Sequence, residues 1–280
     1  WSSSSTFDWP AGRCRPEFRK PFMPRTPSAV LARVGPPVVV LVSVVLLWEL
    51  VVRAFEIPPW LLPAPSAIAA RFVRTQDLWY HTGLTLIEAG SGFAISAVLG
   101  IAMAAGIANS RLLERGIFPY VVVSNAIPII AIVPLLNIWL GFGIATKIVI
   151  AAIITFFPIV TNTTRGLKAA DPRILDFMHS INATRLEVFS KVQLPSALPF
   201  IFAGFKIAAS LSLVGAVVGE FYGADRGLGY LVITAATQLR TDLLFVAIIV
   251  LAVIGIVTFT FFGYLERHAI HGAAEVERQR

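Results

Sequence analysis

The chain has 280 residues, of which 56% are hydrophobic and only 14% are charged, with a net charge of +7 and a mean hydropathy of +0.78. A soluble domain of this length needs far more surface charge, so the composition excludes one and indicates an integral membrane protein. The single cysteine, Cys14, excludes a disulfide framework and a cysteine-rich metal site. We expect the positive charge to face the cytoplasm and anionic lipid rather than nucleic acid.

Residues 1–35 are expected to form a cytoplasmic N-terminal tail. Their first part, residues 1–22, is polar, rich in Ser, Arg and Pro, and has no apolar run of the kind a signal peptide requires. The first methionine is Met23. We therefore interpret residues 1–22 either as a disordered tail or as sequence upstream of the true start, and leave them out of fold reasoning.

Six long apolar runs follow, each of the length that a helix needs to cross the hydrocarbon core at about 1.5 Å per residue. Their residues do not alternate between apolar and polar, which argues against a β-barrel. The sequence predicts an all-α, polytopic membrane protein of about six transmembrane helices within a domain at 36–264, with Pro128, Pro134 and Pro158 breaking or kinking their helices. The runs are 36–53, 84–108, 117–140, 144–164, 200–220 and 243–264.

The distribution of Lys and Arg predicts the orientation, because cytoplasmic loops carry an excess of both. With the N-terminus inside, the internal segments hold 16 of these residues and the external segments six, Lys147 and Arg226 among the six. Both termini are therefore expected in the cytoplasm of a bacterial plasma (inner) membrane protein. Residues 265–280 then form a cytoplasmic C-terminal tail.

The internal loop at 165–199 is the longest and shows two helix starts. Asp171-Pro172 fits an N-cap followed by proline at the first helical position. The stretch Thr184–Glu187 matches a capping box, and Leu194-Pro195 is expected to end that second helix. Between the two helices, Asn182 is a residue that tolerates the left-handed backbone of a tight corner.

This bent pair of short amphipathic helices has two interpretations. Exposed apolar residues with flanking charges suit docking into a groove on a soluble partner. The alternative is a helix pair that lies on lipid headgroups. Spacing alone does not separate the two interpretations. The flanking charges are Arg173, Asp176, Arg185, Glu187 and Lys191.

The run at 176–208 resembles the signature loop of ABC importer permeases, written EAA…G…LP. Asp176 stands at the first acidic position, Leu194-Pro195 fills the closing pair, and Asn182 departs from the usual glycine. Further stretches are similar to the branch of permeases for nitrate, sulfonate and taurine, and for pyrimidine precursors or riboflavin. These stretches are 62–68, 81–101, 127–148, 156–159 and 215–233.

The resemblance implies a type I ABC importer permease fold, a second permease copy as a homodimer, an extracytoplasmic solute-binding protein and a separate ATP-binding subunit. ATP and Mg would be held by that subunit, so this chain is expected to bind no cofactor and to be no enzyme. The solute would be a small organic molecule or anion of the classes just named. The residues implied in coupling to the ATPase are Asp176, Met178, Asn182, Ala183, Arg185, Leu186, Phe189, Leu194 and Pro195.

Polar residues within the spans are costly in lipid, so they are candidates for a functional role. We expect Asn125, Asn137, Asn162 and Glu220 either to line the pore or to serve structural contacts, with Glu220 near enough to a span end to reach the interface. Glu88 is expected to pair with a neighbouring helix.

No Walker A pattern, metal-ligand cluster or nucleophile elbow occurs, which argues against a membrane enzyme. The main alternative to an ABC permease is a secondary transporter driven by an ion gradient. That class predicts inverted repeats and paired ionisable groups, and the sequence shows neither clearly.

Overall fold

The computed structural model describes the backbone of residues 27–278 and the side chains of residues 35–269, so the predictions for residues 1–26 lie outside it. Within the described part the chain is helical and contains no strand, as predicted. Two compact units are present, Trp1–Trp48 and Glu49–Arg280. The described part of the first unit belongs to helix α1, whose side chains from Val38 to Leu47 are mostly exposed and apolar, as a lipid-facing helix requires.

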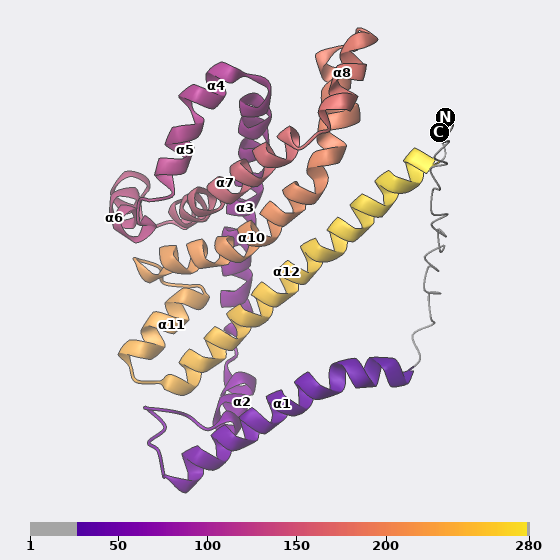
Figure 1. Cartoon of the computed structure of the whole chain (residues 1–280). Coiled ribbons are helices and arrows are strands. Elements are labelled where there is room, and N and C mark those ends of the chain that lie inside the picture. Colours follow the sequence, from indigo (N-terminus) through magenta and orange to yellow (C-terminus); the bar gives the residue numbers. More distant parts are fainter. Residues whose placement is uncertain (1–26, 279–280) are drawn as a thin grey trace, which may run out of the picture. The chain divides into compact units, whose positions relative to one another are not determined.

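The helices follow one another with short connections (Figure 1). Long apolar helices alternate with short ones, and a single π-helical turn, η1, precedes α10. Their bounds are α1 Pro27–Ala54, α2 Pro65–Arg74, α3 Leu78–Asn109, α4 Arg111–Gly116, α5 Phe118–Ser124, α6 Ile129–Leu140, α7 Ile144–Lys168, α8 Pro172–Ser180, α9 Arg185–Val188, η1 Phe189–Gln193, α10 Leu194–Phe221, α11 Leu228–Thr237 and α12 Thr241–Arg278.

Five helices among the described residues are long and apolar enough to cross a membrane. A sixth span results only if Arg111–Ser124 and Ile129–Leu140 are counted together, although their axes are bent by 97°. The run at 117–140 is therefore broken at Pro128, one of the two outcomes predicted for this proline. Pro128 explains the break, because it has no backbone N–H to donate and its ring collides with the preceding turn.

Helices α3, α7 and α10 form the core of the second unit, and small residues let them approach closely (Figure 1). Ala151 of α7 lies between Gly92 of α3 and Gly215 of α10. A Cβ atom on Gly92 would come within 2.6 Å of the Ala151 Cβ, and one on Gly215 within 2.6 Å of its Cα. Such contacts match the way membrane helices gain packing energy, through glycines that bring backbones together. Residues 97–106 are also closely packed, since Ala104 is fully buried and a Cβ on Gly100 would contact Ile159 of α7.

Candidate functional site

The first half of the 165–199 loop forms as the sequence predicts. The Asp171 side chain accepts a hydrogen bond from the Arg173 backbone N–H at 2.9 Å, and Pro172 begins α8. The corner follows, and Asn182 has a φ of +53°. The Ala183 N–H donates to the carbonyl of Met178 at 3.0 Å, which satisfies a carbonyl of the last turn of α8. Asn182 thus supplies the left-handed corner that glycine would otherwise provide.

The second half confirms the capping box but corrects the expected end of the helix. Glu187 accepts from the Thr184 N–H at 2.9 Å, while the Thr184 hydroxyl accepts from the Glu187 N–H at 3.3 Å. Leu194-Pro195 does not end the helix, because the π turn η1 carries it onward into α10. In this wider turn the Leu194 N–H bonds to the carbonyl of Phe189, five residues back. The changed spacing admits the proline ring, so the helix runs from Arg185 to Phe221.

The loop presents four large apolar side chains to its surroundings. Ile174, Phe177 and Ile181 share one face of α8 and the corner, and Phe177 is 62% exposed. Leu186 on α9 is 74% exposed. The sequence analysis singled out Leu186 but missed the α8 face, whose spacing of three and four residues was the available signal. Exposed apolar side chains at adjoining helix ends are what a partner's groove can bury.

The other residues predicted for coupling fall into two groups. Asp176, Asn182, Arg185 and Pro195 are exposed, whereas Met178, Ala183, Phe189 and Leu194 are half-buried. Phe189 and Leu194 pack against a core cluster formed by Leu167, Ala197 and Ile201. These two side chains therefore anchor the loop to α7 and α10, and the exposed ones are free to meet a partner.

The four candidate pore residues occupy different environments. Asn125 is exposed at the break between α5 and α6. Asn137 is buried, and its amide donates to the carbonyl of Tyr222 at 2.7 Å. The Asn162 amide donates to the carbonyl of Pro158 in its own helix at 2.8 Å. The side-chain amides of Asn137 and Asn162 are thus engaged within the protein, although Asn137 also lines an open cavity beside Phe142 and Tyr222, whereas the side chain of Asn125 has no such partner among the described residues.

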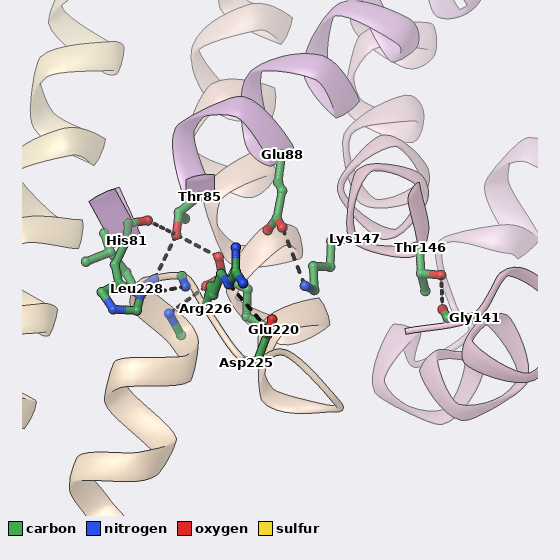
Figure 2. A network of polar contacts seen from close by, with 12 residues as sticks. His81, Thr85, Glu88, Gly141, Thr146, Lys147, Glu220, Asp225, Arg226 and Leu228 are labelled. Carbon is green, nitrogen blue, oxygen red and sulfur yellow. Dashed lines mark hydrogen bonds and ion pairs between the residues drawn. The ribbon is translucent and has the colours of Figure 1, made fainter. Parts of the chain in front are cut away.

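Glu220 belongs to a buried cluster of charges rather than to the interface (Figure 2). Only 1% of it is exposed, and its carboxylate interacts with Glu88 of α3 and Lys147 of α7. The Lys147 ammonium lies 3.6 Å from Glu88 Oε1, which confirms that Glu88 pairs with a neighbouring helix. Lys147 itself is 7% exposed, so its assignment to an external loop is wrong.

Local sequence patterns do not predict that these three charges meet, because they lie on three helices far apart along the chain. Their grouping also corrects the statement that paired ionisable groups are absent. Charges buried to this degree are tolerated only when they are paired. The cluster therefore ties α3, α7 and α10 together at one level.

Glu220 also holds the segment that leads into α11 (Figure 2). Its carboxylate accepts from the Gly229 N–H at 2.6 Å and from the Thr85 hydroxyl at 2.7 Å. The Thr85 oxygen in turn accepts from the Leu228 N–H at 2.8 Å. Gly227, with a φ of +109°, leaves no space for a Cβ beside the Glu220 carboxylate. The start of α11 is thus fixed to α3 and α10.

The arrangement has two parts. One is the capped corner of α8 and α9, which continues into the spanning helix α10, and the other is a core held together by small residues and buried charge pairs. Among the described residues, no group of three or more His, Cys, Asp or Glu side chains could hold a metal ion.

Comparison with known proteins agrees with this description. Residues 96–271 match the model of a family described as "Binding-protein-dependent transport system inner membrane component". A probable ABC transporter permease protein of Haemophilus influenzae is 35% identical over 79% of this chain and 90% of its own length. The formylaminopyrimidine transport permease protein ThiX of Halalkalibacterium halodurans is 34% identical over 82% of this chain and 92% of its own.

A solved structure shows the same fold. The inward-facing MetNI methionine ABC transporter matches with a TM-score of 0.60 and 16% identity, over 70% of this chain and 98% of the matched chain. The family match covers most of the chain, and the predicted type I ABC importer permease fold is confirmed. The chain is therefore a membrane-spanning permease that belongs to the binding-protein-dependent transport system inner membrane components.

Proposed function

We propose that this permease imports a small organic solute as part of an ATP-driven complex. The complex contains two copies of this chain, separate ATP-binding subunits that hold ATP and Mg, and an extracytoplasmic solute-binding protein. The family membership supports this composition. The similarity to ThiX, which is named a formylaminopyrimidine transport permease protein, supports pyrimidine precursors as candidate solutes, beside the sulfonate, nitrate, taurine and riboflavin classes.

The observation that carries the proposal is the rigid corner formed by α8, Asn182 and α9. Capped helix ends and the backbone bond from Ala183 to Met178 hold its shape. The second arm continues without interruption from Arg185 to Phe221, a stretch of 37 residues. A flexible loop would absorb a displacement, whereas this arm transmits it into a span. A partner that grips Phe177 and Leu186 could therefore tilt α10.

The proposed orientation places α8 and α9 in the cytoplasm, with both termini on the same side of the plasma membrane. The excess of Lys and Arg in these segments supports it. On this orientation α4 also faces the cytoplasm, and Figure 1 shows α4 and α8 at the same end of the bundle formed by α3, α7 and α10. The corner of α8 and α9 therefore provides the surface on which docking is tested, and α4 provides a control surface.

The test replaces Leu186 by Arg in the full complex, produced together with the proposed ATP-binding subunit. Leu186→Arg should abolish co-purification of the ATPase and solute uptake, while the permease still inserts into the membrane. Leu112→Arg, at an 81% exposed position on α4, is the control and should leave both intact. Normal ATPase association of Leu186→Arg would refute the docking role.

The alternative of an ion-driven secondary transporter gains one observation from the structure, the buried grouping of Glu88, Glu220 and Lys147. It predicts uptake that continues without any ATPase and stops when the proton gradient is collapsed. The ATP-driven proposal predicts the reverse: uptake in vesicles that requires enclosed ATP and survives an uncoupler.

A further inference from the structure

The break between α5 and α6 places non-helical backbone within the transmembrane domain. The α5 helix ends at Ser124 and α6 begins at Ile129, and residues 122–128 are all exposed. The last carbonyls of α5 accept hydrogen bonds from the N–H groups of residues 125–127, whereas the first N–H groups of α6 have no partner within that helix. In a membrane such backbone is tolerated only where protein covers it or where it lines a water-filled cavity. The break therefore marks a hydrated space along the permease.

A cavity of about 320 Å³ opens at this break. This volume falls at the lower end of the range typical of small-molecule sites, about 300–1,000 Å³. Its walls come from α5, α6, α7 and α10, and they include Asn125, Ile132, Ile153, Phe157 and Leu211. No residue that lines it carries a charge. The cavity is thus uncharged, and it combines apolar side chains with polar groups at the helix break.

Asn125 is the polar side chain that remains available there. The hydroxyl of Ser124, the other polar lining residue, donates to the carbonyl of Val121 at 2.8 Å. In the part of the chain that the structure describes, no hydrogen bond engages the side-chain carboxamide of Asn125. A carboxamide offers a donor and an acceptor side by side, which pairs with an amide-like edge on a solute.

The electrostatics of the break match an uncharged solute. The C-terminal end of α5 and the N-terminal end of α6 carry opposite partial charges of about half a unit each. They lie on either side of four residues, so the break carries no net charge, and its free backbone donors lie at the start of α6. A sulfonate or another fully ionised group would lose its hydration here without gaining a counter-charge.

From this geometry we infer that the cavity at the α5–α6 break is a solute-binding site for an uncharged heteroaromatic compound. In this site Asn125 is the residue that forms hydrogen bonds with the amide-like edge of the compound. Phe157 and the isoleucines contact the ring, and the Asn125 carboxamide pairs with the ring's adjacent donor and acceptor. The inference rests on the proposed function, of which it names the substrate class. It makes Asn125 a specificity-determining residue.

Protection of an engineered cysteine tests the inference in the intact complex. Cys14 is replaced by Ser, and Ile153, a lining residue that is 43% exposed, is replaced by Cys as a reporter. The rate of N-ethylmaleimide labelling is measured with uracil as the uncharged probe and methanesulfonate as the charged one. Uracil should slow the labelling and methanesulfonate should not. Ile127→Cys serves as a second reporter if the first variant does not assemble.

Adding Asn125→Leu should raise the uracil concentration needed for protection by about tenfold or more, because two hydrogen bonds are lost. Asn109→Leu, at an exposed asparagine outside the cavity, is the matched control and should leave that concentration unchanged. Protection by methanesulfonate, or no protection by uracil with either reporter, would overturn the inference. The ATPase association of the same samples reports separately on the proposed function, so the two failures are distinguishable.

Discussion

Removing the ammonium of Lys147 should destabilise the permease strongly. The side chain is 7% exposed and lies 3.6 Å from a Glu88 carboxylate that is 3% exposed. Lys147→Met keeps most of the side-chain volume and deletes the charge. Glu88 and Glu220 then face each other in the protein interior without a cation, and Glu88 Oε2 already has no hydrogen-bond partner. The loss should therefore reflect unpaired buried charge rather than a cavity.

Breaking a buried ion pair by removing one partner costs about 3–5 kcal/mol. For a domain of this size, 1 kcal/mol shifts the melting temperature by about 2–4 °C, so the expected drop is roughly 6–20 °C. Lys168→Met is the control, because the ion pair of Lys168 with Glu114 is substantially exposed on both sides. An exposed pair contributes about 0–1 kcal/mol, and the control should shift by less than about 4 °C.

Thermal unfolding in detergent, followed by the loss of monodisperse protein, provides the measurement. The double variant Lys147→Met/Glu88→Gln removes the charges on both sides and should recover most of the stability. A cycle of single and double variants isolates the interaction between the two side chains. If Lys147→Met unfolds at the parent temperature, or if Glu88→Gln restores nothing, the buried charges do not contribute as the structure indicates.

Two further changes probe the helix core and the loop corner. Gly215→Ala should destabilise the protein by about 1–3 kcal/mol, because the added Cβ would lie 2.6 Å from the Ala151 Cα. Gly255→Ala is the control and should be neutral or slightly stabilising, because its new Cβ would lie no closer than 3.9 Å to another atom. Equal melting temperatures for the two alanine variants would contradict the close approach of α7 and α10. Asn182→Val should strain the left-handed corner by about 1–2 kcal/mol and weaken ATPase association, whereas Asn182→Gly should retain it. Limited proteolysis at 180–184 measures the loosening, and unchanged cleavage of Asn182→Val would argue against a strained corner.

Much of the architecture follows from local sequence. The length of the apolar runs predicts membrane spans because lipid leaves the backbone no other partner than its own helix. Asp171-Pro172 and the Thr184–Glu187 box predict two helix starts, since caps act within a single turn. Asn182 predicts the corner for the same local reason. These features depend on neighbours a few residues apart.

Other features depended on context that the sequence does not display. Leu194-Pro195 signals a helix end, yet the π turn η1 absorbs the proline and joins the loop to α10. Pro128 was expected to break or kink its helix, but the 97° bend it produces also depends on how α5 and α6 pack against α7. At Leu194-Pro195 the local preference of proline to end a helix was outweighed by the continuation of the helix into α10.

The sequence by itself determined that the chain crosses the membrane, where α8 and α9 begin, and which family it resembles, because hydrophobicity and capping act over short distances along the chain. Only the tertiary structure decided that Glu88, Lys147 and Glu220 share one buried cluster and that Asn125 lines an open cavity at the break between α5 and α6. Contacts between helices bring together residues more than fifty positions apart, and such pairings depend on how whole helices pack.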